Sequence, residues 1–191
     1  MNIFVLDENP KIAASMMCDK HVVKMIIESG QMLSTVWRVL DGKQYTELSR
    51  NNRRIKRWKL PYNLFEKMLY KASFVGHPCT QWTMENQKNY YWLATHAYAL
   101  CKEYTYRYKK VHKAEDMISY MRYRKPANIK ISDSMTPFAQ AMPEQYKRED
   151  AAEAYRAYYV GEKISFASWK NRKTPDWFKS KVSFELEGVL V

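Results

Sequence analysis

The stretch IAASMMCDKHVVKMIIESGQMLSTVWRVL (residues 12–40) decides the fold class, because its apolar residues recur at the spacing of one long amphipathic helix. Glycine lowers helix propensity, so the expected place for a kink is near Ser29 and Gly30. The apolar side carries Val22, Val23, Ile26, Ile27, Leu33 and Trp37. The opposite side carries His21, Lys24, Glu28, Gln31, Thr35 and Arg38.

The remaining sequence adds a second long helix and several short ones. The second long helix is expected over residues 78–108, with Pro78 in its first turn. Residues 2–6, NIFVL, are predicted to form either a small strand or a buried N-terminal arm. Short helices are expected within residues 61–73, over AEDMISYMRY (114–123) and over residues 149–163, where Gly161 would be the stop.

The composition favours one helical domain. The chain has 191 residues, of which 46% are hydrophobic and 15% aromatic, enough for one well-packed core. It has only 5 glycines and 7 prolines, which are too few turn residues for an all-β sandwich. We therefore predict an all-α fold: a compact single domain, residues 1–191, of two long helices plus several short ones, with long loops and at most a short N-terminal strand.

The charge points to a polyanionic partner. Lys and Arg total 32 against 20 Asp and Glu, a net charge of +12. Such a surplus attracts nucleic acid first and an anionic membrane surface second. No apolar run approaches the roughly eighteen residues of a spanning helix, and the N-terminus lacks the pattern of a signal peptide. Three cysteines without CxxC spacing indicate reduced, buried thiols and a reducing, cytoplasmic location.

Three residues on the polar side of the first helix are candidates for catalysis. His21, Lys24 and Glu28 are separated by three and four residues, so they share one helix face. An imidazole, an amine and a carboxylate in this arrangement can do acid–base work or stabilise a developing cation. The alternative is a solvated face with an ordinary Lys24–Glu28 pair, which any amphipathic helix can show.

A basic run, RNNRRIKRWK at residues 50–59, is the candidate for binding phosphates. It has no acidic residue, and Trp58 within it could stack on an unpaired base. The alternative is an exposed charged loop without a partner. The net charge favours nucleic acid. The cations of the run are Arg50, Arg53, Arg54, Lys56, Arg57 and Lys59.

The second long helix has a face that combines aromatic and polar residues. Trp82, Asn86, Asn89 and Tyr90 are predicted to line a pocket for a displaced base, with His77 at the start of the helix near the DNA. The alternative is a large core whose few polar atoms bond to one another or to loop backbone. No P-loop, dinucleotide fingerprint or HExxH pattern is present, so we expect no metal and no cofactor.

Three short motifs together resemble the phage-type pyrimidine-dimer DNA glycosylases, also called the endonuclease V-type glycosylase/AP lyases. Asp19-Lys20-His21, followed seven residues later by Glu28, resembles the first helix of that family. Gly76-His77-Pro78 with Trp82 is similar to the start of its central helix. The segment 173–178, KTPDWF, resembles its closing signature, and Lys173 there would contact DNA. The resemblance covers about half of the chain, in three separated pieces.

The resemblance implies a small helical enzyme that binds DNA, flips a nucleotide and cleaves the N-glycosidic bond. Glu28 matches the carboxylate that assists departure of the base, and His21 would lie against the DNA backbone or hold Glu28. Family members use the α-amine of a threonine exposed when the initiator methionine is removed. Here residue 2 is Asn2, whose size disfavours removal of Met1. The nucleophile is therefore the Met1 amine, a lysine (Lys20 or Lys24), or a water activated by Glu28.

The predicted function is a DNA N-glycosylase, with or without an AP-lyase step, acting on a damaged or modified base, with pyrimidines favoured. The segment 41–60 and the loops after residue 113 look like additions to the compact family members, so the lesion itself stays open. The rivals are a non-catalytic nucleic-acid-binding protein and a base-modifying transferase. The expected partner is DNA, with no membrane and no obligate protein partner, and the resemblance alone suggests a phage origin.

Overall fold

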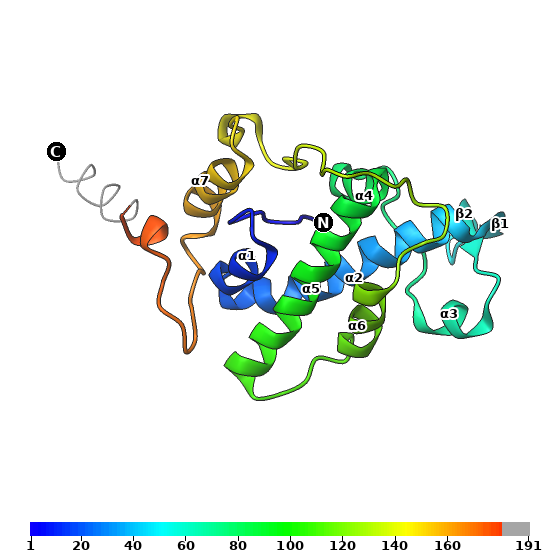
Figure 1. Ribbon diagram of the computed structural model, residues 1–191, viewed down its shortest axis with the longest axis horizontal. Helices are drawn as coiled ribbons and strands as arrows, with labels where there is room; N and C mark the ends of the chain where they lie inside the picture. The colour runs from blue at the N-terminus through cyan, green and yellow to red at the C-terminus, as the bar shows by residue number, and fades with distance from the viewer. Residues whose placement is uncertain (181–191) are drawn as a thin grey trace.

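The described part of the protein, residues 1–180 of a computed structural model, is mostly helical with one small antiparallel sheet (Figure 1). The all-α prediction is confirmed in class, and the sheet is an addition to it. The elements in chain order are α1 (Pro10–Met16), α2 (Asp19–Asp41), β1 (Lys43–Leu48), β2 (Arg54–Lys59), α3 (Asn63–Met68), α4 (Pro78–Glu85), α5 (Gln87–Tyr108), α6 (Glu115–Tyr123), the 3-10 turn η1 (Glu144–Tyr146) and α7 (Ala151–Lys163).

The first long helix is divided at a different place from the one expected. Gly30 lies inside a continuous α2, and the chain breaks at Met17 and Cys18, which both adopt extended backbone conformations. The guanidinium of Arg107 accounts for the break, because it donates to the carbonyls of Met17 (2.9 Å) and Ser15 (3.0 Å). Both carbonyls are thereby satisfied without a continuing helix.

The second long helix is also divided, at Asn86. This residue is extended (φ −159°, ψ 168°), and its side chain accepts hydrogen bonds from the backbone N–H groups of Lys88 (2.8 Å) and Asn89 (3.0 Å). Asn86 is therefore the N-cap of α5, a role that asparagine fills well. The start of α4 is as predicted, with Pro78 in the first turn and His77 as the cap.

The polar and apolar sides of α2 differ from the predicted ones. Val22, Ile26, Leu33 and Trp37 are buried as expected, but Val23 and Ile27 are exposed. On the expected polar side, His21, Thr35 and Arg38 are buried instead. The helix is covered on most of its circumference, because α4, α5 and α6 pack on it together with the N-terminal arm. The exposed stripe of α2 is therefore narrow and contains Lys20, Val23, Lys24 and Ile27.

The N-terminal residues form a buried arm, the second of the two predicted alternatives. Ile3, Phe4, Val5 and Leu6 are all less than a tenth exposed. Phe4 stacks on His21 of α2 (ring centroids 4.5 Å apart) and contacts Tyr155 of α7. Figure 1 shows the arm, in dark blue, running between α7 and α5 to end near the centre of the molecule. This course brings the N-terminus to the middle of α2.

The basic segment, for which no strand was predicted, forms a β-hairpin. Strands β1 and β2 pair in an antiparallel register that runs from Lys43 opposite Lys59 to Leu48 opposite Arg54. A second correction concerns Gly161, which lies within α7 and does not end it. A Cβ atom there would meet the hydroxyl of Tyr146 at 2.3 Å, so the glycine allows close packing of η1 on α7.

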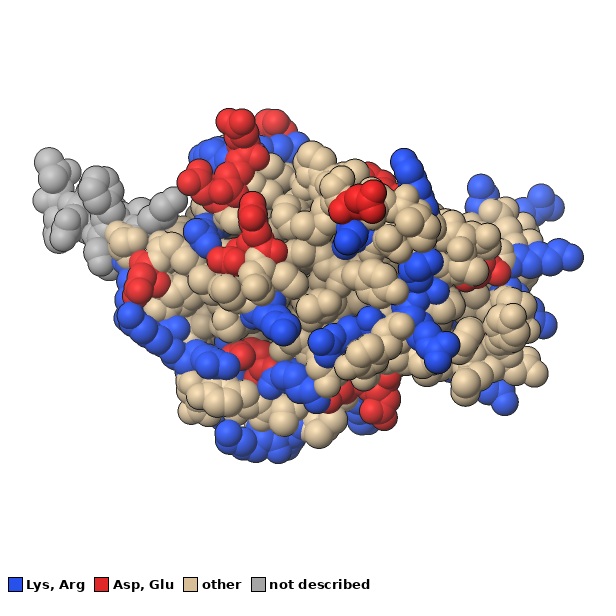
Figure 2. Space-filling view, viewed as in Figure 1, with Lys and Arg blue, Asp and Glu red and all other residues tan. Residues whose placement is uncertain are grey.

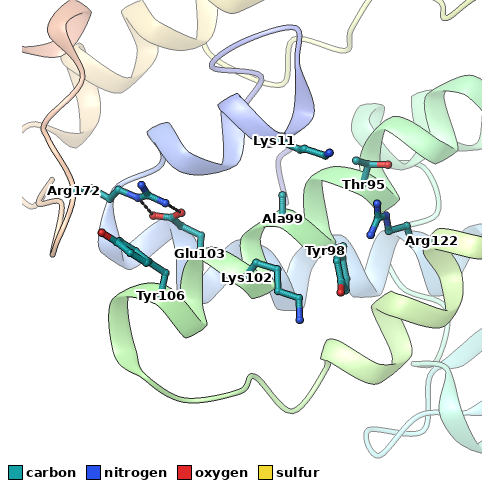
Figure 3. A pocket seen from close by; sticks show the side chains of 9 residues that line it. All are labelled: Lys11, Thr95, Tyr98, Ala99, Lys102, Glu103, Tyr106, Arg122 and Arg172. Atoms are coloured by element: carbon teal, nitrogen blue, oxygen red, sulfur yellow. Dashed lines mark hydrogen bonds and ion pairs between the residues drawn. The ribbon is translucent and has the colours of Figure 1, made fainter.

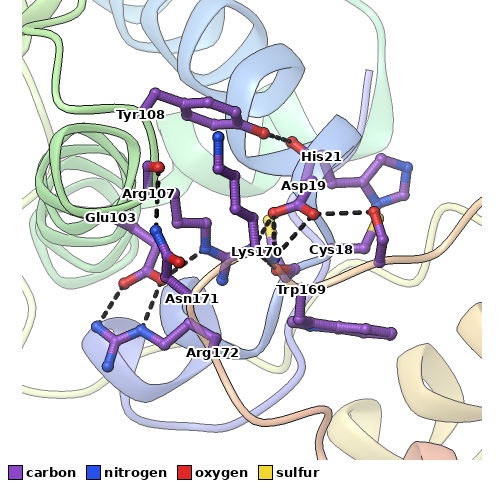
Figure 4. Close-up of polar contacts among 12 residues, drawn as sticks. Cys18, Asp19, His21, Glu103, Arg107, Tyr108, Trp169, Lys170, Asn171 and Arg172 are labelled. Atoms are coloured by element: carbon purple, nitrogen blue, oxygen red, sulfur yellow. Dashed lines mark hydrogen bonds and ion pairs between the residues drawn. The ribbon is translucent and has the colours of Figure 1, made fainter.

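The C-terminal segment after α7 is held against the N-terminus of α2 by ionic contacts (Figure 4). Asp19 accepts hydrogen bonds from the hydroxyl of Ser168 (2.9 Å), the backbone N–H of Lys170 (2.9 Å) and the guanidinium of Arg107 (2.9 Å). Arg172 donates to both oxygens of Glu103. Among the described residues the three cysteines are free and buried, as expected, and no helix is long and apolar enough to cross a membrane.

Candidate active site

The N-terminal amine and Glu28 lie together on the exposed side of α2. The α-amine of Met1 is 3.7 Å from Oε2 of Glu28, and the backbone N–H of Asn2 donates to the same oxygen at 3.2 Å. The ammonium of Lys24 is 3.4 Å from the other oxygen, Oε1. The structure thus brings together three of the four predicted catalytic residues, Met1, Lys24 and Glu28.

The buried arm positions the amine through Asn2. The side-chain amide of Asn2 donates to the carbonyl of Ala141 (2.8 Å), and its oxygen accepts from the backbone N–H groups of Ile3 (2.8 Å) and Phe4 (3.2 Å). Asn2 is 7% exposed, so these bonds lie in a protected environment. The backbone on either side of Asn2 is therefore held in one place, and with it the amine.

The main chain is the accessible part of Met1. The Met1 side chain is only 3% exposed and packs on the core, whereas the residue as a whole is partly exposed. The exposed area therefore belongs mainly to the main chain. Glu28 is 14% exposed and Lys24 68% exposed. The site thus pairs a mostly buried carboxylate with the terminal amine of a partly exposed main chain.

His77 borders this pair. Its imidazole accepts a hydrogen bond from the backbone N–H of Cys79 (3.2 Å), which caps α4. Burial and the positive charge of the Met1 amine lower the pKa of His77, while the carboxylate of Glu28 opposes the shift. His77, which is predicted to contact DNA, therefore lies beside the candidate catalytic pair. The hydrogen bond that its imidazole makes in this structure is a helix cap.

His21, the fourth predicted catalytic residue, belongs to the core. It is 6% exposed, and its Nδ1 lies 2.5 Å from the hydroxyl of Tyr159 in α7. Burial, with Lys163 and Lys24 nearby, lowers the pKa of His21 to about 4. The neutral ring links α2 to α7. The expectation that His21 contacts DNA or holds Glu28 was wrong, because the arm and α7 cover it.

The residues expected to form a base pocket are also buried structural residues. Trp82 and Asn89 hold the segment around Thr136: the indole donates to the carbonyl of Thr136, and the amide of Asn89 donates to its hydroxyl at 2.7 Å. The hydroxyl of Tyr90 accepts from the indole of Trp37 at 2.8 Å. With Asn86 capping α5, all four are 3% exposed or less. The core interpretation of this face is therefore the correct one.

The cations of the basic run lie on the hairpin and its turn. Arg50, Arg53, Arg54, Lys56 and Lys59 are exposed. Arg57 is partly buried, because its guanidinium donates to Glu47 (2.7 Å) and to the carbonyl of Ala72. The hairpin follows α2 directly and is separate from the Met1–Glu28 pair.

Two other basic surfaces lie towards the opposite end. Lys173 is exposed and pairs with Asp176 at 3.0 Å. A hollow of about 460 Å³ lies along α5 and contains four cations, as Figure 3 shows. Two of the four are already in ion pairs, Lys102 with Glu115 and Arg172 with Glu103. The hollow is lined by Lys11, Thr95, Tyr98, Ala99, Lys102, Glu103, Tyr106, Arg122 and Arg172.

The protein is basic and mostly helical, and it places an amine beside a carboxylate. The positive charge suits binding to DNA, and the amine and carboxylate suit catalysis. Residues 1–116 match the family model described as pyrimidine dimer DNA glycosylase. The match covers more than half of the 191 residues, and the chain belongs to this family of base-excision glycosylases. It includes Met1, Glu28 and the hairpin, whereas the KTPDWF segment lies outside it. Neither the curated proteins nor the solved structures provided a match.

Asn2 is the residue whose role the sequence reasoning missed. It entered only as a reason for Met1 to stay in place, yet its side chain fixes the arm and its N–H bonds to Glu28. The apolar run at residues 3–6 was the available signal. An arm that buries these residues must place the preceding two against the body of the protein.

Proposed function

We propose that the family activity, excision of pyrimidine-dimer bases from DNA, takes place at the Met1–Glu28 pair, with the α-amine of Met1 as the nucleophile. The observation that carries this proposal is the 3.7 Å separation between the amine and Oε2 of Glu28. A lyase of this kind needs an amine and a carboxylate at one sugar carbon. Met1 and Glu28 supply them here, although they are 27 positions apart in the sequence, because the arm folds back onto α2.

The chemistry proceeds by an imine. The neutral amine attacks C1′ of the damaged nucleotide, and the electron pair of the N-glycosidic bond leaves with the base, which takes up a proton. Glu28 stabilises the positive charge that develops on the sugar and accepts the proton that the attacking amine loses. The sugar ring opens to an imine, loss of the C2′ proton expels the 3′ phosphate, and water then hydrolyses the imine to release the enzyme.

The lysines are weaker candidates for the nucleophile. Enzymes make a lysine reactive at neutral pH by desolvating it or placing it beside other cations. Lys24 is 68% exposed and pairs with the Glu28 carboxylate, and Lys20 is exposed above the ring of Phe166. Neither has the required environment. As a class, α-amines have a pKa of about 7.7–8.0 against about 10.4 for lysines, so they are more often neutral at pH 7.

Retention of Met1 is part of the proposal. Its side chain is nearly buried, so it contributes to the packing of the arm. If Met1 were removed, the nitrogen of Asn2 would become the terminal amine and would still lie 3.2 Å from Glu28 in the present geometry. The mass of a trapped peptide distinguishes the two forms.

DNA binding is proposed for the exposed cations of the hairpin and of the C-terminal segment. Arg50, Arg53, Arg54, Lys56 and Lys59 on the hairpin and Lys173 near the C-terminal end would contact phosphates, with Arg57 supporting the hairpin. Free, buried cysteines are consistent with work in the reducing interior of a cell.

The test is base release and borohydride trapping on a duplex with one cyclobutane pyrimidine dimer. Base release is read after photoreversal of the dimer, because the cyclobutane ring otherwise holds the cleaved base to the neighbouring pyrimidine. We expect base release, strand cleavage and a covalent complex at the N-terminal peptide. A variant with one extra residue before Met1 should bind DNA but give no trapped complex. Base release that persists without trapping would replace the amine by water as nucleophile. If neither dimers nor a panel of modified bases is cleaved although DNA is still bound, the protein is a binding protein and the proposal is contradicted.

Glu28→Gln is the matched substitution. It keeps the size of the side chain and its ability to accept from Asn2, but it removes the charge. We expect a loss of at least 100-fold in base release with unchanged folding and DNA binding. Glu149→Gln, at an exposed position away from the pair, should retain full activity. Full activity of Glu28→Gln would end this assignment.

A further inference from the structure

The β-hairpin is a rigid extension of the helix that carries Glu28. The buried guanidinium of Arg38, 2% exposed, donates to the carbonyls of Trp58 (2.9 Å), Leu69 (2.9 Å) and Tyr70 (2.6 Å) and to the carboxylate of Glu66 (2.7 Å). One side chain of α2 therefore holds the base of the hairpin and the segment after α3. The orientation of the hairpin is tied to that of α2.

The two faces of the hairpin differ in their contacts. Residues directly opposite one another in an antiparallel pair share a face. On one face, Glu47 pairs with Arg57, and Arg57 donates to the carbonyl of Ala72, so this face lies against the segment after α3. The other face is mostly exposed to solvent. It carries Gln44, Thr46, Leu48, Arg54, Lys56 and Trp58, of which only Trp58 is partly buried.

The charge on the free face and at the turn is almost uncompensated. Within residues 43–59 the only acidic residue is Glu47, which lies on the opposite face. No ion pair is found among the described residues for Arg50, Arg53, Arg54 or Lys56. Figure 2 shows basic side chains projecting from the end of the molecule where Figure 1 places the hairpin. Four unpaired cations on a narrow projection are suited to a phosphate-lined groove.

The length of the hairpin and its distance from Glu28 match the dimensions of duplex DNA. Thirteen residues of helix separate Glu28 from the end of α2 at Asp41, which is about 20 Å. The six-residue strands add up to about 20 Å more. One turn of B-DNA is about 34 Å long, and its major groove, about 12 Å wide, admits a two-stranded β-ribbon.

We propose that the free face of the hairpin enters the major groove of duplex DNA on one side of the lesion, about half a turn to one turn from the nucleotide at Glu28. This inference rests on the proposed function, because that function places the lesion at Glu28. The hairpin then anchors the enzyme on one side of the lesion only. The enzyme therefore requires a longer stretch of duplex on that flank than on the other. Arg54 and Lys56 are the central contacts.

The experiment compares Arg54→Ala/Lys56→Ala with the wild type and with the control Lys110→Ala/Lys113→Ala, which removes the same charge from exposed positions after α5. Three duplexes carry a dimer in the centre, near one end or near the other end. We expect the wild type to bind one end-placed substrate much more weakly than the other. The hairpin variant should lose this difference and bind the central substrate on the order of 10- to 60-fold more weakly at about 0.1 M salt, with a salt slope smaller by about 2. The control should keep the difference between the two ends.

Groove placement has its own readout. N7 of guanine lies in the major groove, so its methylation by dimethyl sulfate reports occupancy there. We expect one-sided protection by the wild type that the hairpin variant lacks. Identical protection in both proteins, symmetric flank requirements or equal binding of single strands would overturn the proposal. Binding to undamaged duplex tests the hairpin without any need for base release. Failure of the glycosylase assay alone would therefore contradict the proposed function but not the proposed role of the hairpin.

Discussion

Glu28 is surrounded by three nitrogen groups that come from different parts of the chain. Lys24 is one turn earlier on α2, whereas the amine of Met1 and the N–H of Asn2 arrive from the N-terminal arm. A surface pair of lysine and glutamate at this spacing is ordinary and contributes little. This pair differs from an ordinary surface pair, because the arm places a primary amine beside the same carboxylate.

His96 is the least satisfied polar side chain of the core. It is fully buried, neither ring nitrogen has a hydrogen-bond partner among the described residues, and its ring stacks on Trp92 at 5.1 Å. Burial alone lowers the pKa of His96 to about 3, from 6.5. The buried imidazole is therefore neutral, and protonation must be accompanied by loss of the packing around it.

This arrangement predicts acid sensitivity. The folded pKa values of His96 and His21, about 3 and about 4, lie below the unfolded value of 6.5, so the unfolded chain binds more protons. Their contribution to stability is complete above pH 6.5 and declines as the pH falls from 6.5 towards 4 and 3. Between pH 7 and pH 4, the free energy of unfolding of the wild type should fall by roughly 3 kcal/mol more than that of His96→Leu. Urea unfolding at the two pH values measures this difference. Equal losses in both proteins would contradict the account.

At the scale of elements, the junction between α2 and the hairpin depends on Gly42. A Cβ atom at this position would lie 2.4 Å from the carbonyl oxygen of Arg38 and 3.2 Å from that of Lys59. Both neighbours are backbone atoms at the point where helix and strand meet. A side chain can therefore be accommodated only if the hairpin shifts relative to α2.

We predict that Gly42→Ala destabilises the protein by about 1–3 kcal/mol and weakens duplex binding, because it loosens the hairpin. Gly76→Ala is the matched control, since a Cβ atom there would have nothing within 4 Å. The control should stay within about 0.5 kcal/mol of the wild type. Urea unfolding measures the first effect and fluorescence anisotropy with labelled duplex the second. A Gly42→Ala protein with wild-type stability and affinity would show that the junction is adaptable.

At the scale of the whole molecule, one ionic network joins segments that are far apart in sequence. Arg107, with a fully buried side chain, pairs with Glu103 (2.7 Å) and Asp19 (2.9 Å), and Glu103 also pairs with Arg172. Glu103 and Arg107 are one turn apart on α5, but both side chains are buried, unlike those of a surface pair. The network connects α5, the start of α2 and the C-terminal segment (Figure 4).

Breaking the network should be costly, because a buried guanidinium would lose a charged partner. We expect Glu103→Gln to reduce the free energy of unfolding by about 3–5 kcal/mol. Glu144→Gln removes a pair with Lys147 in which the carboxylate is 85% exposed, and should change stability by less than about 1 kcal/mol. Thermal or urea unfolding measures the free energy of unfolding of both variants. Similar small effects in the two would mean that Arg107 finds compensation elsewhere.

The sequence by itself determined the helical class and the short helices, and it singled out Glu28 as a candidate for catalysis. These features depend on local properties: the 3.6-residue spacing of apolar residues, Pro78 at the start of a helix, and a carboxylate one turn from a lysine. It also led to the free, buried cysteines and to the positive charge of the segment 50–59. Residues close in sequence carry all of this information.

Only the tertiary structure decided where the first long helix breaks, which polar residues are core and what meets Glu28. The break at Met17 and Cys18 depends on Arg107, about 90 residues away. His21 and Asn89 are polar residues whose partners, Tyr159 and Thr136, come from distant segments, so their burial is invisible in a helical pattern. The Met1 amine reaches Glu28 because an apolar arm must leave water, and that requirement acts through the packed core and not through local spacing.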